Sequence, residues 1–201
     1  MEDDAYLTVE GESEGIYKEK GSRFLGFARP VETERQVRDY MEDLKKKYHD
    51  ARHHCYAFII GTGSQAYFRA NDAGEPNHSA GVPILGQIRS KGLTNTMVAV
   101  VRYFGGTKLG VPGLVNAYKT AAADALANAR IVEKTVRQKL ALRFSYDQMN
   151  EAMRLVKEFD MEIFDQEFQM DCRMTVGVRK SRANEAQEKL ARVNIEANPV
   201  E

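Results

Sequence analysis

The chain has little cysteine and no long apolar run, and both absences limit what it can be. Its only cysteines, Cys55 and Cys172, are too few and too far apart for a disulfide framework, so we expect reduced thiols. No stretch approaches the roughly 18 consecutive apolar residues of a membrane-spanning helix. The start, MEDDAYLTVE, lacks the basic residues and apolar core of a secretion signal. These absences predict a cytoplasmic protein with no membrane partner.

An excess of charge of either sign is also missing, since 29 basic residues balance 29 acidic ones. At first this balance argues against a polyanionic partner. The average hides a gradient along the chain: residues 2–19 carry seven acids and one base, whereas residues 84–130 carry six bases and one acid. The most one-sided basic segment of the chain is therefore 84–130.

Apolar residues make up 43% of the 201 residues, which is enough to bury a sizeable core. Hydrophobic spacing in the N-terminal two thirds predicts the order strand, strand, helix, strand, strand, helix, strand, helix, typical of an α+β domain that ends near Arg130. The expected strands lie within 15–31 (two strands around a turn), 54–61, 65–70 and 96–101, and the expected helices within 32–50, 79–91 and 112–129.

Residues 131–139 do not continue this pattern, and a new one begins after them. A strand, a helix, two strands and a helix follow within about 60 residues, an order typical of a small ferredoxin-like βαββα domain. Their expected ranges are 140–146, 147–159, 161–168, 170–180 and 183–193. The sequence thus predicts an N-terminal domain over 1–132 and a ferredoxin-like C-terminal domain over 139–201.

A glycine-rich loop between a strand and a helix is the most informative feature of the chain. The stretch RYFGGTKLGVPGLVNAYK, residues 102–119, contains four glycines within nine positions. Such a loop presents backbone amides and the positive end of a helix dipole, which favour an anion. An alternative with even odds is that the glycines only permit a sharp corner. The candidate anion-binding or nucleic-acid-binding residues of this loop are Arg102, Tyr103, Gly105, Gly106, Lys108 and Gly110.

A second loop, RANDAGEPNHSAG at 69–81, adds Arg69, Asp72 and Glu75 to the candidates. Acidic residues in such a loop are more often turn formers or partners of a nearby arginine than catalytic or metal-binding groups. Cys55 in its apolar strand is more often a small core residue than a nucleophile. We therefore assign no catalytic residue, metal or cofactor, and enzymatic activity is left open.

Several of these stretches together resemble the YigZ/IMPACT family. They are KGSRFLGFARPV, DARHHCYAF, NDAGEPNHSAGVPIL and VVRYFGGTKLGVPGLVNAY, in order across about 130 residues. Two motifs depart from the usual family pattern: residues 72–78 lack one aspartate, which Ala73 replaces, and residues 111–116 lack one arginine, which Asn116 replaces. The resemblance implies an N-terminal βαβ module like that of a small-subunit ribosomal protein and of domain IV of elongation factor G, and a C-terminal domain like domain V of that factor.

The resemblance also implies a role in translation, because eukaryotic members of the family regulate translation by competing for a protein partner. We expect an RNA-binding or ribosome-associated protein in which the basic segment and the loop amides contact phosphates. Structured or duplex RNA is favoured, since the sequence shows no interleaved aromatics for stacking single-stranded bases. Two alternatives remain open: an enzyme acting on a phosphorylated or acidic small molecule, and a protein-interaction module.

Overall fold

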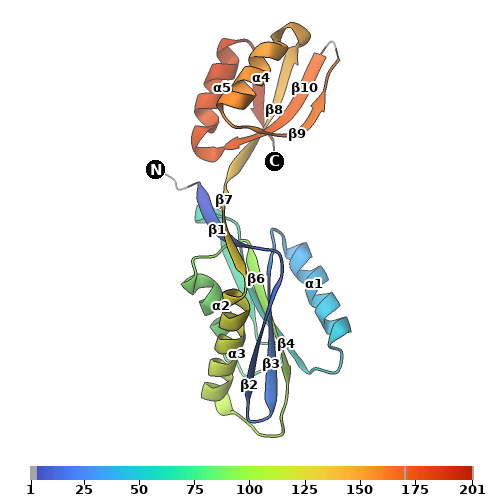
Figure 1. Cartoon of the computed structure of the whole chain (residues 1–201), viewed down its shortest axis with the longest axis vertical. Coiled ribbons are helices and arrows are strands. Elements are labelled where there is room, and N and C mark those ends of the chain that lie inside the picture. The colour runs from blue at the N-terminus through green and yellow to red at the C-terminus, as the bar shows by residue number, and fades with distance from the viewer. Residues whose placement is uncertain (1–3, 170, 201) are drawn as a thin grey trace. The chain divides into compact units, whose positions relative to one another are not determined.

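The computed structural model describes residues 4–169 and 171–200. Its contacts divide the chain into two compact units. The N-terminal domain is Tyr6–Lys134, and the C-terminal domain consists of the chain from Thr135 onward together with the residues before Tyr6. Each unit packs helices on an antiparallel sheet (Figure 1), so the predicted α+β class is confirmed. The expected border between 132 and 139 as a limit of independent folding stays a prediction. No described helix is long and apolar enough to cross a membrane.

The N-terminal domain is built on a five-stranded antiparallel sheet with the strand order β2-β3-β6-β4-β5. Its strands are β2 (Ser13–Glu19), β3 (Ser22–Pro30), β4 (His53–Ile60), β5 (Tyr67–Asn71) and β6 (Thr96–Tyr103). Its helices are α1 (Glu34–Lys47), α2 (Gly81–Ser90) and α3 (Gly110–Ala127). Helix α1 covers one face of the sheet, and α2 and α3 cover the other (Figure 1).

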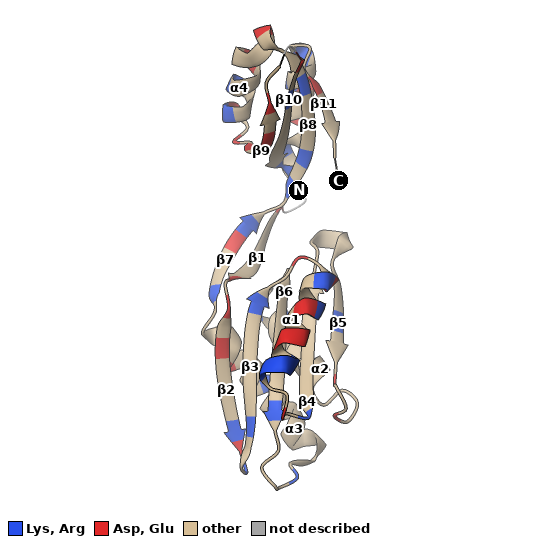
Figure 2. Ribbon diagram, turned by 90° about the vertical axis from the view of Figure 1, so that its right-hand side faces the viewer, with Lys and Arg blue, Asp and Glu red and all other residues tan. Residues whose placement is uncertain are grey.

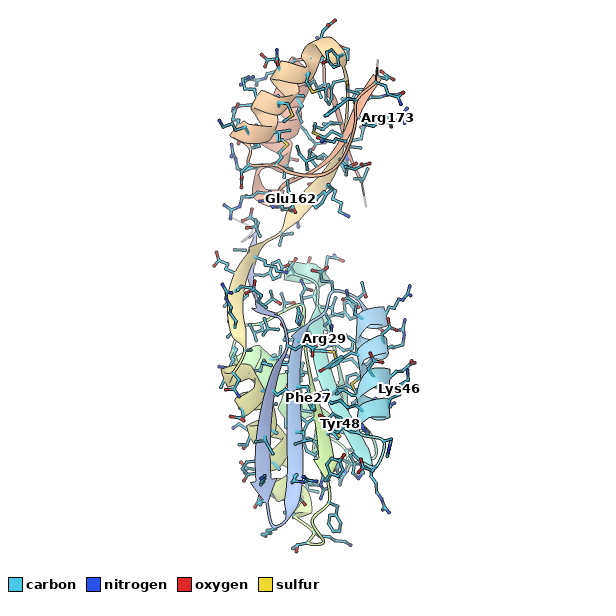
Figure 3. All side chains as sticks on the ribbon, turned by 45° about the vertical axis from the view of Figure 1, so that its right-hand side comes forward. Phe27, Arg29, Lys46, Tyr48, Glu162 and Arg173 are labelled. Atoms are coloured by element: carbon cyan, nitrogen blue, oxygen red, sulfur yellow. The ribbon has the colours of Figure 1, made fainter. Side chains whose placement is uncertain are left out.

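Helices on both faces of the sheet explain why the central strand β6 is apolar from Met97 to Val101. Alternate side chains of a strand point to opposite faces, so Val98 and Val100 pack toward α2 and α3 while Met97 and Ala99 pack toward α1. On the α1 face, the ring of Phe27 lies 5.5 Å from that of Tyr48 between their centroids (Figure 3). The sheet therefore separates two apolar cores.

Helix α3 lies unusually close to the edge of the sheet because its facing residues are small. A Cβ atom at Gly26 would come within 2.5 Å of the carbonyl oxygen of Ala121, and one at Gly15 within 2.2 Å of the amide nitrogen of Ala125. The alanines that the sequence places on one side of this helix are buried against the strands. This confirms the prediction of a small-residue face packed on a sheet.

Two further strands, β1 (Ala5–Glu10) and β7 (Arg130–Thr135), pair with each other outside the main sheet. Neither strand is predicted from the sequence, in which residues 131–139 are interpreted only as a boundary. Strand β7 is largely exposed, so it lacks the alternation of apolar residues by which strands are detected.

The C-terminal domain has a four-stranded antiparallel sheet in the order β11-β8-β10-β9. Its elements are β8 (Arg137–Ser145), α4 (Met149–Glu158), β9 (Glu162–Glu167), β10 (Asp171–Arg179), α5 (Ala183–Arg192) and β11 (Glu196–Pro199). The predicted βαββα order is correct but lacks the last strand, so the fold is a complete ferredoxin-like βαββαβ. Strand β11 is too short and too exposed to leave a pattern. Met170, the first residue of one expected strand, lies outside the described residues.

Candidate functional site

Three connections of the N-terminal domain meet at one end of the five-stranded sheet, which we call the loop end. They are the turn between β2 and β3, the segment 48–52 before β4, and the glycine loop 104–109 between β6 and α3. The glycine loop contacts the β2–β3 turn directly, since the Gly105 amide donates to Ser22 Oγ at 3.1 Å. A Cβ atom at Gly105 would lie 1.9 Å from the carbonyl carbon of Gly21. This glycine is therefore required by close packing.

The other glycines of the loop have a different role. Gly106 and Gly110 have φ angles of 91° and 71°, a conformation that side chains with a Cβ disfavour, and nothing lies within 4 Å of the Cβ position of Gly106. Helix α3 begins at Gly110 with neither a side-chain cap nor an acidic residue in its first turn. Its first amides keep their partial positive charge, which favours an anion. Packing thus explains Gly105, while the start of α3 remains suited to an anion.

Lysine and arginine gather at the loop end from separate parts of the chain, as the colouring of Figure 2 shows. The contributing residues are Lys18, Lys20, Arg23, Arg52, Arg102 and Lys108. All except Arg102 are exposed. Among the described residues, no carboxylate lies within ion-pair distance of Lys18, Lys20, Arg52 or Lys108. The loop end therefore carries exposed positive charge that the protein does not neutralise by direct pairing.

The basic segment 84–130 does not itself form this surface, contrary to the expectation from local charge. Only Arg102 and Lys108 of its six bases reach the loop end. Arg89 and Lys91 lie at the C-terminal end of α2, at the opposite end of the sheet where β4 ends and β6 begins. The remaining positive charge of the loop end comes from residues 18–23 and from Arg52, which the charge count along the chain did not single out.

Beneath the loop, Arg102 and Glu75 form a buried ion pair. The Arg102 Nη1 atom lies 2.6 Å from Glu75 Oε1, and the two side chains are only 8% and 4% exposed. The Tyr118 hydroxyl donates to the same oxygen at 2.7 Å. The rings of Phe24 and Phe104 contact the guanidinium, with centroids 5.5 and 5.7 Å from its carbon. Glu75 is thus the partner of a nearby arginine, one of the two roles considered for it.

The second loop is organised by Asp72, whose carboxylate accepts hydrogen bonds from the backbone amides of His78, Ala80 and Gly81 at 2.8, 3.0 and 2.8 Å. The Ser79 hydroxyl donates to the Pro76 carbonyl oxygen and does not cap this helix. Burial alone raises the pKa of Asp72, but the three amides outweigh it and lower the pKa below its usual value. Asp72 therefore caps α2 as an anion.

Cys55 lies in the same buried region, on the face of the sheet that α2 and α3 cover. Its thiol donates to the Asp72 carbonyl oxygen at 3.0 Å. Burial raises the pKa of the thiol to about 12, so it stays protonated at neutral pH. Burial also raises the pKa of the neighbouring Tyr118 hydroxyl. Neither group is activated as a nucleophile. No three described His, Cys, Asp or Glu residues are grouped to hold a metal ion.

Two of the predicted site residues point to the opposite face of the sheet from Arg102. Arg69 pairs with Glu34 of α1 at 3.4 Å. The Tyr103 hydroxyl donates to Asp50 Oδ1 at 2.7 Å, and burial is secondary to this bond in raising the pKa of Tyr103. The structure brings Arg102, Glu75, Asp72 and the glycine loop to the loop end, but leaves Arg69 elsewhere.

Arg52, His53 and Phe104 were not among the predicted site residues, and the structure places all three at the loop end. Phe104 is 57% exposed and is a single ring beside the loop-end cations, not a series of interleaved aromatics. Phe104 directly precedes the glycine pair and could be found from the sequence, but nothing in the pattern shows that its ring faces outward.

The family profile of the Impact N-terminal domain matches residues 20–126, which span the five-stranded sheet from the β2–β3 turn into the end of α3. The chain belongs to the IMPACT family. Among curated relatives, the IMPACT family member YvyE of Bacillus subtilis is 32% identical over 161 residues, covering 77% of this chain and 74% of YvyE. The IMPACT family member YigZ of Escherichia coli is 30% identical and covers 86% and 85% of the two chains.

Solved structures extend the likeness of this IMPACT-family protein to the whole chain. The crystal structure of a hypothetical protein, 28% identical, superposes with a TM-score of 0.74 over 98% of each chain. The structure of the two-domain translational regulator Yih1 aligns over 60% of this chain and 48% of its own with a TM-score of 0.40, too low for a comparison of folds. The family likeness therefore covers both domains.

Proposed function

We propose that this IMPACT-family protein binds structured RNA through the loop end of its N-terminal domain. By binding RNA it regulates translation. The expected association with the ribosome is then made through ribosomal RNA. One observation carries the proposal: exposed lysines and arginines from several separate chain segments surround the glycine loop, and no carboxylate of the described residues pairs with Lys18, Lys20, Arg52 or Lys108. Exposed positive charges that are gathered at one end of a sheet and are not neutralised by carboxylates attract a polyanion to that end.

The chemistry of the loop end suits a phosphate backbone better than an isolated acid. Lysines contact phosphates as flexible point charges, and each contact releases a condensed counterion from the nucleic acid. Lys18 and Lys20 lie at the β2–β3 turn, and Lys108 lies in the glycine loop that packs on that turn. Positive groups spread over neighbouring loops can contact successive phosphates of one strand.

The role in translation rests on the resemblance to a family whose eukaryotic members regulate translation. Family membership covers residues 20–126, and these contain the glycine loop and the β2–β3 turn. The resemblance implies that the ferredoxin-like C-terminal domain, too, is similar to a domain of a translation factor. RNA as the direct ligand is the part of the proposal that the charge distribution supports.

The test is the salt dependence of binding to a fluorescently labelled RNA hairpin, measured by anisotropy. Lys108→Ala and Lys20→Ala each remove one exposed charge from the loop end. We expect weaker binding and a slope of log K against log salt that is smaller in magnitude by about 0.9 for each substitution, taking the value for a DNA duplex. Lys91→Ala is the matched control, because Lys91 is exposed and unpaired but lies at the opposite end of the sheet.

The proposal would be overturned if the slope of log K against log salt were the same for the two loop-end variants, Lys108→Ala and Lys20→Ala, as for the control Lys91→Ala. Arg102→Ala is not a suitable variant, because it would leave the Glu75 carboxylate buried without its cation. Gly106→Val supplies a second comparison, since it leaves the charge unchanged and alters only the loop conformation. Loss of RNA affinity in Gly106→Val at an unchanged melting temperature supports the loop as part of the binding surface.

A protein-interaction module is the second candidate, and one observation favours it. Edge strand β5 has a free hydrogen-bonding edge, and its Tyr67 and Phe68 side chains are exposed. An extended segment of a partner can pair with such an edge. Replacing Phe68 with Ser would then weaken binding to a protein partner and leave RNA binding at the loop end unchanged.

A further inference from the structure

Beside the glycine loop, the loop end contains a pocket of about 540 Å³. This volume lies within the range of roughly 300–1,000 Å³ typical of small-molecule sites. The pocket is lined by Asp50, Ala51, Arg52, His53, Arg102, Tyr103 and Phe104. It therefore lies between the beginning of β4 and the end of β6, which are neighbours in the sheet.

Arg102, which lines this pocket, has a guanidinium that is only partly satisfied by the protein. Glu75 accepts from Nη1, whereas the described residues provide no hydrogen-bond partner for Nε. Buried polar groups almost always have a partner, so an unsatisfied donor on a side chain that is 92% buried is unusual. The planar guanidinium can offer parallel N–H groups to an oxyanion.

His53 is directly opposite Arg102 in the pairing of β4 with β6, so the two side chains share a face of the sheet. The Nδ1 atom of His53 lies 3.0 Å from the Ala73 carbonyl oxygen. A carbonyl oxygen only accepts, so Nδ1 must carry the hydrogen and Nε2 is the nitrogen left for another partner. Arg52, the preceding residue, adds an exposed guanidinium to the same pocket.

Phe104 provides an aromatic ring on which a nucleotide base can stack. One face of its ring contacts the Arg102 guanidinium, yet the side chain is 57% exposed. Aromatic rings next to cationic groups are stacking platforms for bases. Asp50 lines the pocket as well, and its carboxylate accepts a hydrogen bond from the Tyr103 hydroxyl at 2.7 Å.

We infer that this pocket binds the phosphate monoester of a nucleotide, with the phosphate at Arg102, His53 and Arg52 and the base on Phe104. A monoester carries about −1.5 to −2 charges at neutral pH and three acceptor oxygens, whereas an internal phosphodiester offers less of both. The monoester belongs either to a free mononucleotide or to the terminal phosphate of an RNA. The inference rests on the proposed function in one respect, namely that an RNA end would enter beside the loop that binds internal phosphates.

The first experiment compares AMP with adenosine by calorimetry on the full chain. We expect AMP to bind at least about 10-fold more tightly, the effect of one or two charge-assisted hydrogen bonds. The Nε–H resonance of Arg102 in a nitrogen-15 NMR spectrum should shift with AMP and stay in place with adenosine. Equal binding of the two compounds, or an unmoved Arg102 resonance, would overturn the inference.

The second experiment uses RNA hairpins of one sequence with either a 5′-phosphate or a 5′-hydroxyl end. Preference for the phosphorylated hairpin identifies an RNA end as the source of the monoester. Preference for AMP over adenosine without any preference between hairpins supports the pocket with a free nucleotide as its ligand. Equal affinity in both pairs of probes contradicts the pocket, while a Lys108-dependent salt slope with either hairpin leaves the proposed RNA function intact.

Three variants assign the binding to this pocket without disturbing the buried ion pair. Arg52→Gln and His53→Gln should each lower the affinity for AMP by on the order of 10-fold. Phe104→Ala should weaken AMP, adenosine and both hairpins together, because it removes the stacking surface and not the phosphate ligands. Arg35→Gln is the control, since Arg35 is exposed near the start of α1 at the opposite end of the sheet. Unchanged AMP affinity in all three pocket variants would show that the phosphate binds elsewhere.

Discussion

The arginines near the two ends of the five-stranded sheet differ in their ion pairing. Near the opposite end from the glycine loop, arginines pair with glutamates: Arg29 with Glu12 at 3.0 Å, Arg69 with Glu34 at 3.4 Å and Arg130 with Glu10 at 2.8 Å. At the loop end, the exposed lysines and Arg52 have no such partners among the residues that the structure describes. Charges that are not neutralised by pairing attract an anion more strongly, so we expect an anion at the loop end and not along the segment with the highest local count of bases.

A second difference lies in burial. The pair of Arg102 and Glu75 at the loop end is almost completely buried, whereas the pair of Arg69 and Glu34 is largely open to solvent. Solvent screens an exposed pair, so it adds little to stability. Breaking a buried pair strands a charge away from water and is costly. The loop end therefore combines exposed basic residues with a buried ion pair beneath them.

The largest expected effect comes from removing one member of each pair. Arg102→Ala should lower the free energy of unfolding by about 3–5 kcal/mol, because Glu75 remains buried without a cation. Arg69→Ala, the matched change at the opposite end, should cost about 0–1 kcal/mol. Urea denaturation at constant m-value measures both. Similar denaturation midpoints for the two variants would show that the buried pair stabilises the protein no more than the exposed pair does.

A smaller effect separates the two kinds of glycine in the loop. Gly105→Ala should destabilise the protein by about 1–3 kcal/mol, because the new methyl group overlaps the backbone of Gly21. Gly106→Ala has free space around it and should cost only about 1 kcal/mol, the strain of its positive φ angle. Thermal unfolding of both variants tests the order. The reverse order would mean that the loop moves away from the β2–β3 turn easily.

Asp72 gives the loop end a dependence on pH. Asp72→Asn should cost about 1 kcal/mol at pH 7, since an amide accepts more weakly from the three backbone N–H groups than a carboxylate does. The folded protein lowers the pKa of Asp72, so its contribution is complete above the unfolded value near 3.8 and is lost as pH falls through the folded value. Denaturation at pH 7 and below pH 3.8 should show the difference between wild type and variant shrinking in acid. A difference that grows in acid would contradict the charged cap.

The smallest effect concerns His78, which has a φ angle of 63° in the loop that Asp72 organises. A side chain in this region is strained by about 1–2 kcal/mol, and glycine relieves the strain but loses more chain entropy on folding. His78→Gly should therefore raise the free energy of unfolding by less than about 1 kcal/mol. The effect of His78→Gly is compared with that of Asn95→Gly, a change at the opposite end of the sheet where φ is 48°. Destabilisation by His78→Gly would mean that the imidazole makes a contact worth more than the strain.

The sequence predicted the elements of the core well and the peripheral ones poorly. Strand β6 and helix α3 were found because buried elements repeat apolar residues at the spacing of a strand or helix. Strands β1, β7 and β11 were missed because short or exposed strands carry no such repeat. The candidate site divided in the same way: the glycine loop was found from its composition, whereas the outward-facing ring of Phe104 was not.

By itself, the sequence determined that the chain folds as an α+β protein, that glycines lead into α3, and that Lys108 and Arg102 lie near them. These are local properties, fixed by spacing and composition over a few residues. Only the tertiary structure decided which charges share a surface, because antiparallel pairing places residues far apart in the chain side by side. It brought Gly105 against Ser22 and His53 opposite Arg102. It also buried Glu75 with Arg102, and it left Lys18, Lys20, Arg52 and Lys108 without a carboxylate partner among the described residues.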